Sequence, residues 1–149
     1  MPVMGVARFE RFFRTAASLD VDKSDLKRYD EFLDRKIYDL FVVAKAAAKA
    51  NGRDVIEPRD LPVTKGLQER MHEFRKMDED LEVVPLLEQL LARPPLGIAI
   101  SEDTEARLPA IAGGLSVALA QAFKIIEPRV KHPGSAEWDQ VLRMFELLL

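Results

Sequence analysis

The chain has 149 residues, of which 48% are hydrophobic and 32% are charged, and its net charge is −3 at neutral pH. A chain of this length can bury a core without a structural metal, and with no cysteine it forms no disulfide and performs no thiol chemistry. We expect a single domain over residues 1–149. The N-terminus has no apolar leader and no apolar run is long enough for a membrane span, which predicts a cytoplasmic protein.

Charge is distributed unevenly along the chain. Residues 1–76 contain 16 basic and 13 acidic residues, a net charge of +3, whereas residues 77–149 contain 6 and 12, a net charge of −6. Proteins that bind nucleic acid usually present a net basic surface. The chain as a whole does not, so any contact with nucleic acid has to use local patches in the first half.

The first half reads as a short, a long and another short helix. Apolar side chains recur at helical spacing, with charged side chains between them. Asp, Ser or Thr before such a run can cap a helix start, and an Asn-Gly pair after it supplies a left-handed helix end. The expected elements are a helix over residues 4–18, a long helix from Asp22 or Ser24 to Asn51-Gly52, a short extended bridge over residues 54–57 and a helix from Thr64 to Met77.

The second half repeats this order less regularly. Pro109 lies inside the expected long helix and should kink it or break its first two turns. No strand-like alternation lasts five residues, so the expected fold class is all-α. Leucines 147–149 either pack with the last helix or form an exposed apolar tip for a partner chain. The expected elements are a helix from Leu81 to Leu91 stopped by Arg93-Pro94-Pro95, an extended loop over residues 97–100, a long helix from Ser101 to about Lys131 and a last helix over residues 138–148.

Two stretches of the sequence can be overlaid at an offset of 79 residues. Residues 46–61 correspond to residues 125–140, and each stretch ends a long helix, passes through a tight loop and places an Asp seven residues after a basic residue. An internal repeat of this kind indicates a duplicated helical unit. The two pairs are Arg53 with Asp60 and His132 with Asp139.

The helix lengths and the run Ala48-Lys49-Ala50-Asn51-Gly52-Arg53 followed by Asp60 resemble the histone fold, in the single-chain doubled form of a group of prokaryotic proteins of uncharacterised function. The resemblance covers nearly the whole chain. It implies two tandem histone-fold motifs, over residues 1–77 and 78–149, that pack as an intramolecular pseudo-dimer. It also implies a structural clamp between Arg53 and Asp60, with a weakened or absent clamp at His132 and Asp139.

One long amphipathic helix with two short flanking helices cannot bury its own apolar face, so each motif needs a partner. The two long helices should cross near Ile37 and Ser116, where small residues allow the backbones to approach closely. These small residues are Gly113, Gly114, Ser116, Ala118 and Ala120. The resemblance further implies that loops of the two motifs lie side by side. The expected loop contacts are residues 98–100 with residues 55–57, and Val21 with residues 134–136.

The DNA-binding residues of histones do not carry over to this chain. In the family, the two residues after the clamp arginine contact DNA, and here those positions hold Asp54 and Val55 in the first motif and Pro133 and Gly134 in the second. A carboxylate repels a phosphate, and a valine side chain donates no hydrogen bond. We therefore expect a non-catalytic module for protein–protein association, including self-association. The alternative is weak, sequence-independent DNA binding through Arg8, Arg11, Arg14 and Lys23.

Patterns that would indicate enzyme or metal chemistry are weak. Residues 20–31 match part of the calcium-loop pattern, but Asp25 stands where that loop requires Gly. A helix cap is therefore the favoured interpretation. His72 and His132 have no partner histidine at helical spacing, and Ser116 lacks the flanking glycine of a nucleophile elbow. We expect no enzyme activity, no catalytic residue, no metal ligand, no cofactor and no small-molecule substrate.

Overall fold

The structure, a computed structural model, describes residues 3–90 and 97–149. Most of these residues lie in helices and the described strands are two residues long, so the fold class is all-α, as the sequence predicts. In chain order the elements are α1 (Val3–Ala17), α2 (Lys23–Ala50), β1 (Val55–Ile56), η1 (Pro58–Asp60, a 3₁₀ turn), α3 (Lys65–Leu81), α4 (Val84–Leu90), β2 (Ala99–Ile100), α5 (Glu102–Ile126) and α6 (Ser135–Leu148).

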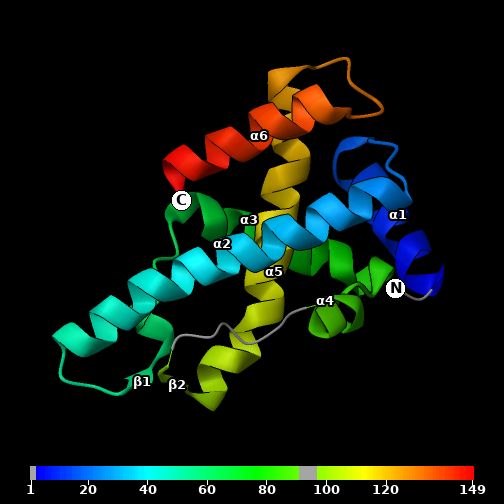
Figure 1. The fold of residues 1–149 in the computed structure, drawn as a ribbon. Coiled ribbons are helices and arrows are strands. Elements are labelled where there is room, and N and C mark those ends of the chain that lie inside the picture. Colours follow the sequence, from blue (N-terminus) through cyan, green and yellow to red (C-terminus); the bar gives the residue numbers. More distant parts are fainter. Residues whose placement is uncertain (1–2, 91–96) are drawn as a thin grey trace.

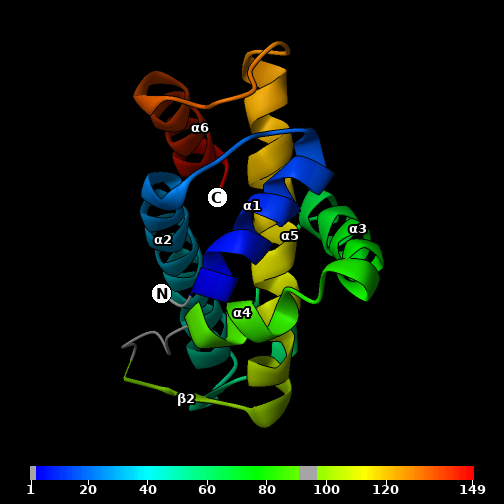
Figure 2. The same cartoon turned by 90° about the vertical axis from the view of Figure 1, so that its right-hand side faces the viewer.

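The long helix α5 forms the central column of the molecule (Figure 1). Figure 2 shows α2 and α6 on one side of this column, α3 on the opposite side, and α1 and α4 in front of it. Residues 111–117 of α5 are all buried, as expected for a helix that is covered all round. Aromatic rings from α1 and α2 meet beside it: Phe9 and Phe13 lie with their ring centroids 5.0 and 5.6 Å from that of Tyr29.

The start of α2 is fixed by a capping box. The side chain of Asp22 accepts hydrogen bonds from the backbone N–H groups of Ser24 and Asp25, and the side chain of Asp25 accepts one from the backbone of Asp22. The Ser24 hydroxyl, followed by the Asp25 backbone, lowers the pKa of Asp22. These acids of the calcium-like stretch therefore serve as a helix cap. At the other end Gly52 takes the left-handed conformation, with φ 70°, that the Asn51-Gly52 pair predicts.

Two of the small residues of α5, Gly113 and Gly114, face a different neighbour from the one that we expected. A Cβ atom added to Gly113 would lie 2.3 Å from the ring of Phe74, and one added to Gly114 would lie 2.5 Å from the side chain of Met71. Both neighbours belong to α3. The two glycines thus allow α3, rather than the long helix α2, to approach α5 closely. The prediction was wrong because helical spacing shows that a stripe is small but not which helix it meets.

A buried hydrogen bond between two side chains links the long helices α2 and α5. The hydroxyl groups of Tyr29 and Ser116 lie 2.7 Å apart, and Ser116 also donates to the backbone carbonyl of Ala112 at 2.7 Å. This link involves Ser116, as expected, but on α2 it lies two turns before Ile37. Complete burial raises the pKa of Tyr29.

The third helix is longer than the sequence indicates. It passes the predicted end at Met77 and reaches Leu81, so the expected motif boundary at residue 77 falls inside α3. Glu82 then turns the chain in the left-handed region, at φ 51°. The Asp78 side chain accepts hydrogen bonds from the backbone N–H groups of Val83 and Val84. Helix α4 begins at Val84 instead of Leu81. The predicted stop at Leu91 and Arg93-Pro94-Pro95 lies outside the described residues.

The second long helix is unbroken at Pro109 and shorter than expected at its end. It includes Pro109 without an interruption, so its first two turns are intact. It ends at Ile126 instead of Lys131. Glu127 is extended, with φ −141° and ψ 96°. The ring of the next residue, Pro128, disfavours a helical backbone at the residue before it.

Helix α5 has one further property. Its length and its apolar composition would suffice for a membrane span, and it is the one described helix of which this is true. More than half of its apolar stretch, 56%, is buried inside the molecule. A core helix of this kind passes the same test of length and composition.

Candidate functional site

Arg53 and Asp60 meet at one end of the molecule. Arg53 donates two hydrogen bonds to the two carboxylate oxygens of Asp60, with N···O distances of 2.7 and 2.6 Å. The Asp60 side chain is 3% exposed and also accepts from the backbone N–H of Glu57 at 2.8 Å. The Arg53 hydrogen bond lowers the pKa of Asp60 to about 2, and Asp60 in turn raises the pKa of Arg53. A paired, bidentate contact of this kind fixes the loop between the two residues.

The same loop is joined to the second half of the chain. Strands β1 and β2 pair in parallel, with Val55 opposite Ala99 and Ile56 opposite Ile100, so the predicted contact of residues 55–57 with residues 98–100 is confirmed. The Ile56 carbonyl accepts from the Ser101 backbone at 3.1 Å. It also accepts from the hydroxyl of Thr104, a fully buried residue, at 2.9 Å. We call this end, formed by residues 51–60 and 97–104, the clamped end.

A second pair of loops meets at the opposite end of the central helix, as Figure 1 shows. The backbone N–H of Asp20 donates to the carbonyl of Lys131 at 2.7 Å. Val21 lines the same hollow as Gly134 and Ser135, as expected from the predicted contact of Val21 with residues 134–136. We call this end, formed by residues 18–28 and 127–138, the open end.

The open end contains no pair between His132 and Asp139. His132 lies 3.7 Å from Asp20 instead, and its side chain is 77% exposed, whereas Asp139 is exposed on α6. A buried hydrogen bond joins α6 to α2 at this end: the indole N–H of Trp138 donates to the carboxylate of Asp25 at 2.9 Å. Trp138 is completely buried and packs edge to face on Phe123 of α5.

The four basic residues that we predicted for DNA do not gather at one place. Arg8 donates to the backbone carbonyl of Glu82 at 3.2 Å, near the end of α3. Arg14 lies 3.7 Å from Asp20, which places it at the open end, and Lys23 begins α2 there. Arg11 is exposed on α1.

The two loop residues after Arg53 are both engaged within the chain. Asp54 accepts a hydrogen bond from Lys49 at 2.8 Å, which lowers the pKa of Asp54, and Val55 is used in strand β1. At the open end the structure adds two exposed cations that the sequence interpretation missed, Arg129 and Lys131. They belong to the acidic half, and the bond from Asp20 to Lys131 brings them beside the first half.

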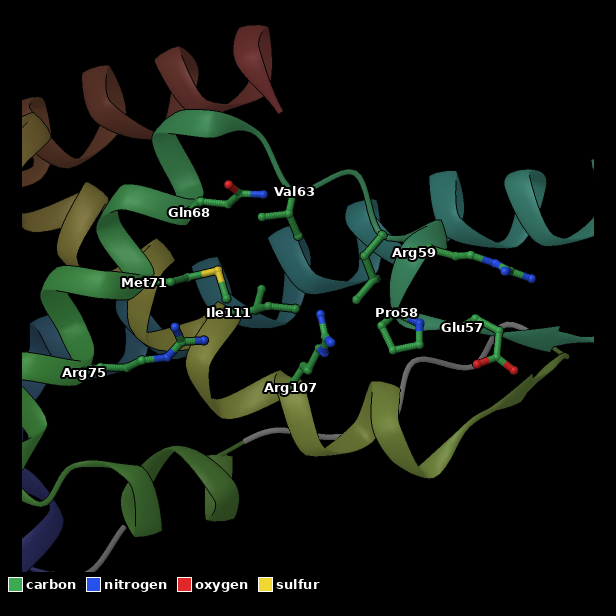
Figure 3. Close-up of a pocket in the computed structure, with 10 residues that line it drawn as sticks. Glu57, Pro58, Arg59, Val63, Gln68, Met71, Arg75, Arg107 and Ile111 are labelled. Atoms are coloured by element: carbon green, nitrogen blue, oxygen red, sulfur yellow. The ribbon is translucent and has the colours of Figure 1, made fainter.

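An open groove of about 810 Å³ lies between η1, α3 and α5 (Figure 3). Its floor contains the buried residues Met71 and Ile111. Arg75 projects into it from α3 and Arg107 from α5, whereas Arg59 points away from Arg107. No sequence motif marks this groove, because the residues that form it are far apart along the chain.

Metal chemistry is not suggested by the geometry. Within residues 3–90 and 97–149, no group of three or more His, Asp or Glu side chains is arranged to hold an ion. His72 is exposed on α3, and Ser116 is occupied by its two buried hydrogen bonds.

The helix order and the two joined loop pairs describe an all-α protein in which loops of the first and second halves of the chain meet at both ends of α5. Residues 9–146 match a family described as a domain of unknown function, DUF1931, and the chain belongs to that family. An uncharacterised protein of Aquifex aeolicus (strain VF5) is 31% identical over 120 residues, which are 80% of this chain and 70% of that protein.

Two crystal structures resemble this one over almost its whole length. One, from Thermus thermophilus, is 51% identical, has a TM-score of 0.85 and is matched over 97% of both chains. The other, from Aquifex aeolicus, is 27% identical with a TM-score of 0.85, over 97% of this chain and 95% of that one. The likeness to these relatives indicates no activity or ligand, so the function has to be argued from the residues.

Proposed function

We propose that the chain is a non-catalytic module of two histone-fold motifs, paired within one polypeptide, that associates with protein, first of all with a second copy of itself. The pairing proposal is supported by the helix order short, long, short in each half. It is supported further by loops of the two halves that meet at both ends. The bidentate contact between Arg53 and Asp60 stands where the resemblance implies a clamp.

The observation that carries the association proposal is an exposed apolar edge at the end of α6. Contacts of Trp138 with Asp25 and of Glu146 with Lys36 make α6 run parallel to α2. Val43 lies seven residues after Lys36, on the same face of α2, beyond the point that α6 covers. Val43 is 52% exposed, and Leu147 and Leu148 are 85% and 77% exposed. We call Val43, Leu147 and Leu148 the apolar edge.

An apolar edge of this kind favours a partner that covers it. Large apolar side chains gain no burial energy while they face water, and a partner that covers these three side chains would supply it. A second copy offers an identical edge, and a two-fold contact would bring the α2 and α6 ends of both copies together. The C-terminal leucines then serve as the partner-binding tip, which is one of the two alternatives that the sequence left open.

Sedimentation velocity over a range of concentrations tests this proposal. The wild-type chain should associate as concentration rises, and Val43→Glu with Leu147→Glu should keep it monomeric, because the added charges cannot be buried. Ile125→Glu is the matched control, since Ile125 is 75% exposed on α5 and does not belong to the apolar edge. A wild-type chain that stays monomeric at all concentrations, or equal effects of both variants, would contradict self-association.

The second candidate function is weak, sequence-independent binding of DNA at the open end. The observation that favours it is the juxtaposition of Arg129 and Lys131 with Lys23 and Arg14 through the bond from Asp20 to Lys131. Each phosphate that a cation neutralises steepens the salt dependence of binding by about 0.9 in log–log slope. We expect no complex with duplex DNA at physiological salt and a weak one at low salt. Binding that survives physiological salt and is lost in Arg129→Glu/Lys131→Glu would favour this candidate over the first.

A further inference from the structure

The groove between η1, α3 and α5 contains two arginines without an acidic partner in the described structure. Arg75 and Arg107 make no ion pair or hydrogen bond within the parts of the chain that the structure describes. Neighbouring arginines do: Arg53 is paired with Asp60, and Arg70 on the same helix as Arg75 lies 3.3 and 3.2 Å from Glu69 and Glu73. The chain has three more acids than bases, so this difference is not due to a shortage of carboxylates.

The two guanidinium groups enter the groove from different helices. Figure 3 shows Arg107 rising from α5 toward η1 and Arg75 reaching across from α3, with Met71 and Ile111 between the two helices. Met71 and Ile111 are 8% and 2% exposed, so the floor is apolar and closed. A guanidinium binds a carboxylate with two parallel hydrogen bonds, and it loses less hydration energy than an ammonium group does when it is covered. The groove therefore combines anion donors with an apolar floor.

We propose that this groove binds an acidic, extended peptide segment of a partner protein, with carboxylates on Arg75 and Arg107 and an apolar side chain on Met71 and Ile111. Alternate side chains of an extended segment point in opposite directions and can serve walls and floor in turn. A nucleic-acid backbone fits less well. A chain of phosphates has no apolar group to place on Met71 and Ile111, whereas a peptide can alternate carboxylates with apolar side chains.

This inference extends the proposed function, because it names a second kind of protein partner, but it uses a separate surface. None of the apolar-edge residues Val43, Leu147 and Leu148 lines the groove. A double variant at the apolar edge should therefore leave peptide binding unchanged, and a double variant in the groove should leave self-association unchanged. Failure of one proposal is distinguishable from failure of the other.

The test measures fluorescence anisotropy of a short labelled peptide in which glutamate alternates with leucine and serine, titrated with the full chain. We expect saturable binding at moderate salt, weakened about tenfold or more by Arg75→Glu/Arg107→Glu because attraction becomes repulsion. Arg75→Lys/Arg107→Lys should give an intermediate loss, since the charge stays and the bidentate contact is lost. Arg129→Glu/Lys131→Glu, the same change of charge at the open end, is the matched control and should bind as the wild type does.

Three outcomes would overturn the inference. The first is the absence of saturable binding to the wild-type chain. The second is an equal loss in the groove variant and the open-end control, which would indicate attraction by net charge alone. The third is competition by a single-stranded oligonucleotide as effective as that by unlabelled peptide, which would make a phosphate chain the occupant. Circular dichroism of each variant checks that the helices persist, and the exposed positions of Arg75 and Arg107 favour this.

Discussion

The two ends of the molecule join the same two halves of the chain by different chemistry. At the clamped end, a buried carboxylate with a bidentate arginine fixes the loop, and a parallel strand pair ties it to the other half. At the open end, one backbone hydrogen bond joins the loops, and His132 lies 3.7 Å from Asp20 in an exposed contact. Trp138, buried against Phe123 and bonded to Asp25, fastens that end from inside.

The two loop junctions thus rest on different residues, an arginine–aspartate pair at one end and a buried tryptophan at the other. An ion pair on the surface contributes little to stability, whereas a buried tryptophan contributes much through its apolar area. The cations Arg129 and Lys131 of the open-end loop face solvent, while the backbone carbonyl of Lys131 joins the loop to Asp20.

The largest effect should come from the open end, at its buried tryptophan. Trp138→Ala should lower the free energy of unfolding by about 3–5 kcal/mol, because it removes a completely buried ring and leaves a cavity beside α5. Trp138→Phe retains an aromatic ring and loses the hydrogen bond to Asp25, which should cost about 1–3 kcal/mol. Urea unfolding measures both. Losses below about 1 kcal/mol in both variants, the size of an average substitution, would show that this end is not fastened from inside.

The clamped end should respond to the loss of charge pairing. Arg53→Ala leaves the carboxylate of Asp60 buried without its partner, and we expect the melting temperature to fall by several degrees. Arg59→Ala is the control, because Arg59 is exposed and forms no ion pair with Asp60 in the described structure. Differential scanning calorimetry compares the two. A fall of the same size in both variants would mean that the pair does not fix the loop.

Acid should weaken the clamped end selectively. The folded-state pKa of Asp60, about 2, lies below the ordinary value of 3.8, so the folded state binds a proton less readily than the unfolded state. The stability that Asp60 contributes is therefore present above roughly pH 4 and is lost as the pH falls toward about 2. Asp60→Asn should be less stable than the wild type at neutral pH, and the difference should shrink in acid. A difference that stays constant from neutral pH into acid would contradict this origin.

The smallest effect should come from the exposed histidine of the open end. His132→Ala removes a contact 3.7 Å long from a side chain that is 77% exposed, and we expect no measurable change in melting temperature. The experiment is a direct comparison with Arg53→Ala at neutral pH. A fall as large as that of Arg53→Ala would show that the open end has an ionic clamp after all.

Much of the fold could be predicted because its signals are local. Asp22 and Asn51-Gly52 mark the ends of α2 through capping and backbone preference, and the spacing of Arg53 and Asp60 within one loop places them within reach of each other. The end of α3 was harder to predict from the sequence. Asp78 accepts the hydrogen bond from Val83 because the chain turns at Glu82. No local sequence pattern predicts this turn.

The candidate sites that were missed depend on contacts between helices. Gly113 and Gly114 mark a close approach, but the identity of the neighbour, α3, follows from the packing of the whole molecule. Arg75 and Arg107 are ordinary surface arginines in the sequence and become a pair only when α3 packs on α5. Arg129 lies in the half of the chain with a net negative charge, so the net charge of that half gave no indication of a local basic site.

The most direct test of the account is a cross-link between the halves at the clamped end. The chain contains no cysteine, so Val55→Cys/Ala99→Cys introduces one pair of thiols and no competitor. These residues are opposite each other in the strand pair, and neighbouring strands lie about 4.8 Å apart, within the Cα separation that a disulfide spans. We predict that mild oxidation gives a disulfide within one chain and a higher melting temperature. Thiols that stay free, or disulfides that join two chains, would contradict a pairing of the two halves within one polypeptide.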